Sequence, residues 1–458
     1  MLTRLEIDGF KSFADFSVDL RPFMVFVGPN AVGKSNLFDA LRLLSRLAEH
    51  DLRTAVDAVR GDPADLFRRR CDGAACSRLW LAAEVCLPPR VRDPWGEEYD
   101  VSHTRLRYEV EIERRRDDRG LERLFVVKEA ATPIVRKDDK WRALASREFQ
   151  QGFLRYGRRK PLLETALDTE RPLFHLHQDG KAGRKRPASA AEATVLSSIV
   201  NAEFPLLFAL REELRNWRFL QLDPSALRRP SSALAGSVLG EDGTNLASVL
   251  GRLRAETRTA ARPDGVLAEI AGRLASLIPG VRTVGVEEDP ELREFRVKLQ
   301  MRDEQPFNAP VVSDGTLRVL ALLTLLYDPA HGGGICFEEP ENGIHPARLQ
   351  ALLQALREMV TDPGAPRPDD RRVFTQILMN SHSPVVLAGL RGALEHVMFV
   401  DVVSRVNGDG TGVDRVTRMR CVRPVLPGLG EEHLVSPYEI DQYLSHAAPP
   451  STGQGEPE

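Results

Sequence analysis

Hydrophobic and polar residues alternate along several short stretches of the chain, as they do in strands that bury one face. The stretches that predict strands in the first third are 2–8, 14–20, 23–27, 79–86, 106–113 and 123–128. The third of these is wholly apolar and has the character of a short strand. In the fifth, Tyr108, Val110 and Ile112 share one face. We interpret the last three stretches as a β-meander.

Elsewhere, apolar residues recur every three or four positions, as on helices that pack against a core. The stretches that predict helices are 37–47, 189–216, 246–253, 267–277, 316–327 and 346–359. Ser189 and Glu192 fit a capping box at the start of the second helix, and Pro205 is expected to kink or split it. Further strands are predicted at 217–222, 294–299, 335–337, 373–379 and 397–402. The pattern therefore indicates an α/β protein.

Two segments lack a clear pattern. Residues 132–187 are charged, and we expect their basic run 181–186 to be an exposed loop, with a nucleic-acid contact as the alternative. Residues 447–458 have no apolar anchor and predict disorder. The predicted segments are 1–130, 131–290, 291–425 and 426–458. The second is expected to be an inserted and largely helical region.

The composition sets wide limits on function. Of 458 residues, 42% are hydrophobic and 28% are charged, as in ordinary globular proteins, and the net charge of −3 gives no global attraction to nucleic acid. The five cysteines are irregularly spaced, which favours free thiols over a zinc site. We find neither a signal peptide nor an apolar run of the ~20 residues that a membrane span needs. We therefore expect a cytoplasmic protein with no membrane partner.

A glycine-rich loop lies between the wholly apolar strand and the first predicted helix. It reads G-x-x-x-x-G-K-S from Gly28 to Ser35, in the context of a phosphate-binding loop, although a chance glycine-rich turn is the alternative. Gly28 and Gly33 allow a tight turn that directs backbone N–H groups at a phosphate chain. We expect Lys34 to reach the β- and γ-phosphates of ATP, and the Ser35 hydroxyl to ligate Mg²⁺.

Two carboxylates follow the apolar stretch 335–337. Burying adjacent acids without a cation is costly, so Glu338 and Glu339 predict a bound Mg²⁺. Glu338 is expected to hold the metal or its water, and Glu339 to polarise the attacking water. His382 follows the next apolar stretch and is expected to donate a hydrogen bond to the γ-phosphate. The alternatives are incidental acids at a strand end and a structural histidine.

A second candidate anion site precedes the helix predicted at 316–327. Ser313 and the backbone at Gly315 can form an anion-binding helix N-terminus, and an ordinary helix cap is the alternative. One chain already contains one phosphate loop. A second cradle therefore predicts closure over the nucleotide of another subunit.

These stretches resemble the ABC-type P-loop ATPase head of the RecF, SMC and OLD group. Residues 28–36 resemble its G-P-N-x-x-G-K-S-N loop, which includes Asn30 and Asn36, and 9–13 resemble its early F-K/R-S-F element. The resemblance implies that Lys11 approaches the nucleotide phosphates. It also implies a signature loop at 313–316, a Walker B element at 338–341 and a switch histidine at His382.

The sequence is most similar to small bacterial AAA-family ATPases with S-D-G-T-L, E-E-P-E-N-G-x-H-P and T/S-H-S-P motifs. Some of these act in anti-phage defence beside a nuclease partner, as in Septu- and PARIS-like systems. The resemblance covers 1–130 and 215–405. It departs from the wider superfamily at Asp314, where Gly is usual, and at Glu338, where Asp is usual. The residues of a Toprim nuclease are not found, and the candidates for the Q-loop glutamine are Gln150, Gln151 and Gln178.

The sequence therefore predicts a Mg²⁺-dependent ATPase that works as a nucleotide-closed homodimer. By analogy with the group, DNA or a nuclease-type effector protein is the expected partner. One alternative is a transporter ATPase subunit, against which the F-K-S-F element, Asn36 and the long middle region argue. The other is a scaffold that binds ATP without hydrolysing it.

Overall fold

The computed structural model describes most of the chain. The described residues are 1–116, 120–157, 159–168, 171–178, 181–201, 203–329, 331–365, 374–406, 412–423 and 433–445. The predicted disordered tail, 447–458, lies outside them. Residue contacts group the chain into a first unit of 1–217, 360–378 and 393–437, and a second unit of 218–359, 379–392 and 438–458. Within the described ranges, none of the helices combines the length and the apolar character that crossing a membrane requires.

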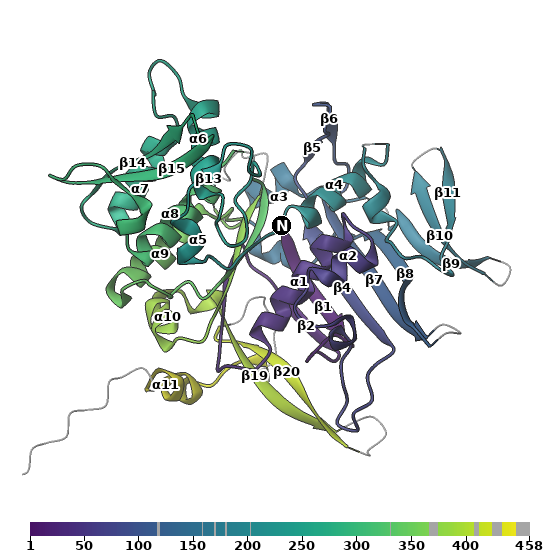
Figure 1. The fold of residues 1–458 in the computed structure, drawn as a ribbon. Helices are drawn as coiled ribbons and strands as arrows, with labels where there is room; N and C mark the ends of the chain where they lie inside the picture. Colours follow the sequence, from purple (N-terminus) through teal and green to yellow (C-terminus); the bar gives the residue numbers. More distant parts are fainter. Residues whose placement is uncertain are drawn as a thin grey trace, which may run out of the picture. The chain divides into compact units, whose positions relative to one another are not determined.

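An antiparallel eight-stranded sheet forms much of the first unit (Figure 1). In spatial order its strands are β11 (Lys181–Pro187), β10 (Arg171–Gln178), β9 (Leu163–Asp168), β8 (Glu122–Pro133), β7 (Arg105–Arg116), β4 (Arg78–Cys86), β1 (Leu2–Asp8) and β2 (Phe16–Asp19). The predicted meander is confirmed as β4, β7 and β8. As predicted, β7 buries Tyr108, Val110 and Ile112 on one face.

The opposite face of this sheet carries charged side chains that pair across strands. Arg107 of β7 contacts Glu6 of β1 and Glu109 of its own strand, and Lys128 of β8 also contacts Glu109. The neighbouring acids hold the pKa of Arg107 above its ordinary value against the opposing effect of burial. Alternating apolar and charged residues thus give this sheet one core face and one polar face.

The middle region contains more strand than predicted. Residues 163–187 form β9, β10 and β11, which extend the sheet, although we expected a largely helical insertion and a loop at 181–186. In β11 the residues Gly183 to Pro187 are all exposed, so the strand has no apolar face to reveal its period. Backbone pairing with β10 nevertheless fixes its position, with one shift of register between Leu176 and Gln178 of β10.

A second sheet in the first unit carries the glycine-rich loop. In it β3 (Phe23–Val27) pairs in parallel with β19 (Val397–Val406), and β19 pairs antiparallel with β20 (Val413–Cys421). The strand β18 (Thr375–Ser381) lies on the other side of β3, and its residues to Leu378 belong to this unit. The strand predicted at 23–27 is confirmed as β3, and every one of its residues is buried.

Helices cover the sheets of the first unit. The helices are α1 (Lys34–Leu47), α2 (Leu52–Asp57), α3 (Arg147–Phe153) and α4 (Pro205–Arg215), with short 3-10 helices η1 (Pro63–Leu66), η2 (Trp141–Leu144) and η3 (Leu196–Ser198), and a hairpin of β5 (Arg90–Arg92) and β6 (Glu98–Asp100). Helix α1 packs against α2 and α4 (Figure 1). The stretch predicted as one helix at 189–216 is divided at Pro205, one of the two outcomes expected there, since Pro205 begins α4 and the short η3 precedes it.

The second unit combines a small antiparallel sheet with a helical core. The sheet contains β13 (Ser231–Ser232), β14 (Val281–Asp289), β15 (Glu294–Met301) and β16 (Phe307–Asn308). The helices are α5 (Pro224–Leu227), α6 (Leu246–Thr257), α7 (Leu267–Leu277), α8 (Asp314–Leu326), α9 (Pro346–Met359), α10 (Pro384–Gly389) and α11 (Pro437–Ser445), with 3-10 helices η4 (Ala309–Val311) and η5 (Arg391–His396), the last of which ends in the first unit. As predicted, α8 is almost wholly buried, and it packs against α5, α6 and α7 (Figure 1).

Parallel strands position the acidic residues of the second unit. Here β12 (Arg218–Leu220) pairs in parallel with β17 (Gly333–Glu338), and the last residues of β18 follow β17 in strand order. Residues 333–337 of β17 are buried and Glu338 is half-buried. Glu339 directly follows β17 and His382 directly follows β18, so these neighbouring strands bring the two residues close together. The mixed and antiparallel sheets with flanking helices confirm the predicted α/β class.

Candidate nucleotide-binding site

The glycine-rich loop connects β3 to α1 in the first unit, as the sequence predicts. Gly33 has a φ of +100°, and a Cβ there would lie 2.1 Å from Thr417 Oγ1. A Cβ at Gly28 would lie 2.1 Å from the carbonyl oxygen of Val400. Only glycine fits either position, so the loop can keep its backbone N–H groups turned toward a phosphate chain.

Lys34 lies inside this loop. Its ammonium donates to the carbonyl oxygens of Gly28, at 2.7 Å, and of Pro29, and the residue is 8% exposed. A primary amine in this position is a donor to anionic oxygens that enter the loop. Ser35 is half-buried at the start of α1, whereas Asn30 is exposed at the tip of the loop.

The F-K-S-F turn packs beside the loop and contributes two side chains. Asn36 Nδ2 donates to Ser12 Oγ at 2.8 Å, so the partner of this amide is the turn. Lys11 Nζ donates to Asp39 Oδ2 at 2.7 Å and to the Arg60 carbonyl oxygen at 2.8 Å. Asp39 is buried in α1 and also accepts from Arg60. The two cations therefore converge on one buried carboxylate near the loop.

In the second unit, Glu339 is held by several groups directly after β17. Its φ of +51° is unusual for a residue with a side chain. Its N–H donates to the Asn380 carbonyl oxygen at 3.0 Å and lies 3.3 Å from Asn380 Oδ1. Asn342 Nδ2 donates to Glu339 Oε2, and His382 Nδ1 lies 3.3 Å from Oε1. Hydrogen bonds thus hold a strained backbone, and both carboxylate oxygens face polar partners.

The residues around this carboxylate are fixed in turn. Glu341 Oε1 accepts from the Ser381 hydroxyl, and the His382 carbonyl oxygen accepts from the Tyr443 hydroxyl at 2.7 Å. Burial lowers the pKa of the Arg318 guanidinium on α8, and the charges of Asp314 and Glu339 oppose that effect.

The candidate signature loop caps α8. Ser313 is exposed and is the N-cap residue, since its Oγ accepts from the Thr316 N–H at 3.3 Å. Arg228 donates to the Asp314 carboxylate and, at 2.8 Å, to the Val312 carbonyl oxygen. Ser313 therefore forms an ordinary helix cap, which is the alternative to an anion site for this stretch. It leaves the Ser313 side chain on the surface.

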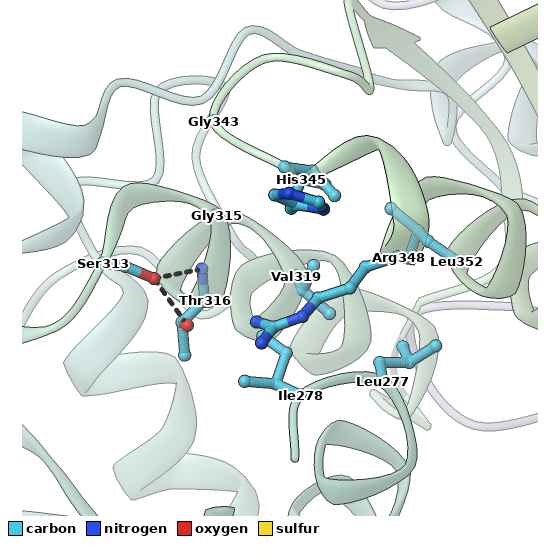
Figure 2. Close-up of a pocket in the computed structure, with 11 residues that line it drawn as sticks. Leu277, Ile278, Ser313, Gly315, Thr316, Val319, Gly343, His345, Arg348 and Leu352 are labelled. Atoms are coloured by element: carbon cyan, nitrogen blue, oxygen red, sulfur yellow. Dashed lines mark hydrogen bonds between the residues drawn. The ribbon is translucent and has the colours of Figure 1, made fainter. Parts of the chain in front are cut away.

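Gly315 packs against the turn that follows Glu339. A Cβ on Gly315 would lie 2.2 Å from the Gly343 carbonyl oxygen, so the two backbones touch. A small cavity of about 40 Å³ lies beside this contact, with Thr316 on one side and His345 and Arg348 on another (Figure 2). The cavity has room for about one water molecule and none for a nucleotide.

The predicted site residues thus fall into two groups. The first unit contains Lys11, Gly28, Asn30, Gly33, Lys34, Ser35 and Asn36, and the second contains Ser313, Gly315, Glu338, Glu339 and His382. Sequence reasoning missed Asn342 and Asn380, which hold Glu339, and Arg228, which holds the signature loop. An amide at a strand end is a weak signal in a single sequence, since most such residues are ordinary turn formers.

The Q-loop glutamine is not identified among the three candidates. Gln150 Nε2 donates to the carbonyl oxygens of Arg142, at 3.3 Å, and Ala145, at 2.9 Å, which caps a local turn. Gln151 is exposed in α3, and the side chain of Gln178 lies outside the described part of the chain.

Among solved structures, the chain is similar to three SMC heads. An SmcHead bound to the C-winged helix domain of ScpA shares 14% identity, covering 92% of this chain and 98% of that chain, with a TM-score of 0.48. An Smc head domain with an extended coiled coil, bound to the C-terminal domain of ScpA derived from Pyrococcus furiosus, shares 12% identity. The match covers 92% of this chain and 96% of that chain, with a TM-score of 0.46. The SMC head domain from Thermotoga maritima shares 12% identity, and the match covers 92% of this chain and 99% of that chain, with a TM-score of 0.38.

Family models match both parts of the chain. One described as "AAA ATPase domain" matches residues 1–76, which include the phosphate loop. One described as "AAA domain, putative AbiEii toxin, Type IV TA system" matches residues 88–388, which include the signature loop, the acidic strand end and His382. The second match spans more than half of the chain. With a P-loop between β3 and α1, the chain therefore belongs to this family of AAA domains and is a P-loop NTPase.

Proposed function

We propose that this protein is a Mg²⁺-dependent ATPase that switches between open and nucleotide-closed states of a homodimer. The observation that carries the proposal is the arrangement of Glu339, whose two carboxylate oxygens face His382 and Asn342 at the end of a buried strand. A carboxylate that is held in place and partly exposed is suited to orient an attacking water. This arrangement favours hydrolysis over the scaffold alternative, in which ATP is bound and no water has to be oriented.

The residues present fit a magnesium nucleotide. A Cβ at Gly28 or Gly33 would collide with the strands and the turn packed against the loop, so glycine is needed for its tight course, and the Lys34 ammonium already donates to the Gly28 carbonyl oxygen. The proposed metal ligands, the Ser35 hydroxyl and the Glu338 carboxylate, are the hard oxygen donors that Mg²⁺ prefers. Bound Mg²⁺ would neutralise charge on the β- and γ-phosphates.

Each group has a distinct role in this proposal. Lys34 donates to phosphate oxygens and stabilises the charge that develops on them in the transition state. Glu339 accepts a hydrogen bond from the attacking water and aligns it. His382 donates to the γ-phosphate, and its contact with Glu339 couples the position of one group to that of the other. These roles deliver water to phosphorus in line with the leaving oxygen.

The dimer explains the exposed helix N-terminus of α8. Ser313 and the first N–H groups of α8 form an end that can bind an anion. The phosphate loop already serves the nucleotide of its own chain, so this end is available for another one. Seated on the nucleotide of a second copy, this end would make closure depend on the γ-phosphate. Hydrolysis would then release the two copies and change the state presented to a partner. We propose DNA or a nuclease-type effector as that partner, in a DNA-related or anti-phage defence function of the cytoplasm.

Phosphate release and oligomeric state test the proposal together. We expect the wild-type protein to release phosphate from MgATP, and Glu339→Gln to lower that rate by at least about a hundredfold while retaining ATP. In light scattering, the variant is expected to accumulate as a dimer with ATP and to remain monomeric with ADP. Turnover by neither protein, even with DNA and partner present, would favour the scaffold. Co-purification with a membrane subunit would favour the transporter.

A further inference from the structure

A chain of hydrogen bonds runs behind the phosphate loop and ends on a strand near the C-terminal part of the first unit. Asn36 Nδ2 donates to Ser12 Oγ at 2.8 Å. The Thr417 hydroxyl of β20 lies 2.7 Å from Ser12 Oγ and 2.8 Å from the carbonyl oxygen of Val32. Thr417 is only 4% exposed, so water does not compete for these bonds. Three segments far apart in sequence thus meet behind the loop.

The number of available protons decides which group donates in each of these hydrogen bonds. Each hydroxyl carries a single proton. If Thr417 donates to Val32, Ser12 is left to donate to Thr417, and the Asn36 amide donates to Ser12. All four groups are then satisfied together. Removal of the Thr417 hydroxyl would leave the Val32 carbonyl and the Ser12 proton without these partners.

The same hydroxyl touches the glycine that closes the loop. A Cβ at Gly33 would come within 2.1 Å of Thr417 Oγ1 and 2.7 Å of Ser12 Oγ. Thr417 therefore packs directly on the backbone that begins α1. The Thr417 N–H also donates to the Ser12 carbonyl oxygen at 3.0 Å, so the strand and the F-K-S-F turn remain joined without the hydroxyl.

We propose that Thr417 is a positioning residue for nucleotide binding, which fixes the closing turn of the phosphate loop through its hydroxyl. The hydroxyl holds Val32 and Ser12, and Ser12 holds Asn36. The loop N–H groups then meet the phosphates without a further cost of ordering. This inference rests on the proposed function for its consequence in ATP affinity. The hydrogen bonds of Thr417, Ser12, Val32 and Asn36, which we call the brace, are present in the protein without nucleotide.

Two substitutions that differ by one oxygen isolate the hydroxyl. Thr417→Ser and Thr417→Ala both lose the methyl group, and only the second loses the hydroxyl. We expect Thr417→Ala to bind MgATP and MgADP about five- to tenfold more weakly than Thr417→Ser, since one buried hydrogen bond is worth about 1 kcal/mol. Hydrogen exchange of the amides in 32–36 is expected to be about fivefold faster in Thr417→Ala without nucleotide.

Thr194 supplies a matched control at the other end of α1. It is 2% exposed, and its hydroxyl donates to the Leu47 carbonyl oxygen at 2.7 Å. Thr194→Ala should melt at a lower temperature than Thr194→Ser, with equal nucleotide affinity and equal exchange in 32–36. Equal exchange in Thr417→Ala and Thr417→Ser would overturn the inference. Equal affinities in proteins that bind ATP would overturn it too. Faster exchange in a protein that hydrolyses no ATP would support the brace and count against the proposed function.

Discussion

His382 Nδ1 lies 3.3 Å from Oε1 of Glu339, and both side chains remain partly exposed, at 42% and 46%. The two residues come from neighbouring strand ends 43 positions apart in sequence. The two strand ends are also joined by backbone, since the N–H of Glu339, which has a left-handed conformation, donates to the Asn380 carbonyl oxygen. The contact therefore depends on the second unit folding as a whole. It leaves one face of both groups open to a substrate.

Replacement of His382 tests the role of this contact. We expect His382→Ala to lower the turnover of MgATP by about a hundredfold, the loss that follows removal of one preorganised donor to a transition-state oxygen. ATP affinity should change by less than about threefold, because in the proposed function the phosphate loop makes most of the binding contacts. Steady-state phosphate release and equilibrium titration with a fluorescent ATP analogue separate the two effects.

His50 is a suitable control for that substitution. It lies 3.7 Å from Glu49, so it is also a histidine beside a glutamate, and it belongs to the turn after α1 rather than to either strand end. His50→Ala should retain full turnover. Normal turnover by His382→Ala would contradict the role assigned to His382.

The phosphate loop makes a second prediction. Gly33→Ala would place a methyl group against Thr417 Oγ1 at a backbone φ of +100°, where side chains are strained. We expect the loop to shift and MgATP affinity to fall by at least about a hundredfold. Gly152→Ala in α3, where no heavy atom lies within 4 Å of the new Cβ, should bind ATP normally. Isothermal titration calorimetry measures both. Wild-type affinity in Gly33→Ala would show that phosphates bind elsewhere.

The signature loop makes a third prediction. A Cβ at Gly315 would meet the Gly343 carbonyl oxygen at 2.2 Å, so Gly315→Ala must separate the N-terminus of α8 from the turn at Gly343. We expect this variant to bind ATP with near wild-type affinity but to form no ATP-dependent dimer, because Ser313 would no longer meet the second nucleotide. Sedimentation velocity with MgATP in the Glu339→Gln background measures the dimer.

Gly272→Ala tests whether any glycine substitution in the second unit has the same effect. Gly272 lies in α7 with open space around the new Cβ, and alanine favours a helix over glycine by about 1 kcal/mol. This variant should dimerise with ATP and melt at a slightly higher temperature. A normal dimer in Gly315→Ala would contradict closure through the signature loop.

The residues that we propose to carry the chemistry could be selected from the sequence because their signals are local. A glycine loop between an apolar strand and a helix identifies Lys34 and Ser35 from a dozen neighbouring residues. An apolar stretch that ends in two acids does the same for Glu338 and Glu339. The supporting residues were not predictable. Thr417 is 405 residues from the Ser12 hydroxyl that it touches, and one threonine in a strand carries no periodic signal.

The missed strands have a different physical cause. Gly183 to Pro187 in β11 are all exposed, so the hydrophobic pattern that reveals a strand is missing there. The strand is defined by backbone pairing alone, for example between His175 and Lys185. Charged residues at a sheet edge also discourage pairing with other chains. A loop is the natural reading of such a sequence until the neighbouring strand is known.

The last prediction concerns a buried carboxyl group of the eight-stranded sheet. Glu129 of β8 is completely buried and accepts hydrogen bonds from the Tyr108 hydroxyl at 2.9 Å and from the N–H groups of Val195 and Leu196. Burial raises the pKa of Glu129 to about 7, and these hydrogen bonds only partly offset the effect. The folded state therefore binds this proton more tightly than the unfolded chain, where the group has its ordinary pKa of 4.5.

The sign of the pH dependence follows from that difference. The stabilising contribution of the Glu129 proton is fully present below pH 4.5 and is lost as pH rises toward 7, by a total of about 3 kcal/mol. Glu129→Gln cannot titrate, so its free energy of unfolding minus that of the wild type should increase by about this amount between pH 4.5 and 8. Urea denaturation of both proteins across this range measures the difference, in which the other titrating groups cancel. A difference that is the same at every pH would mean that Glu129 keeps its charge in the folded protein.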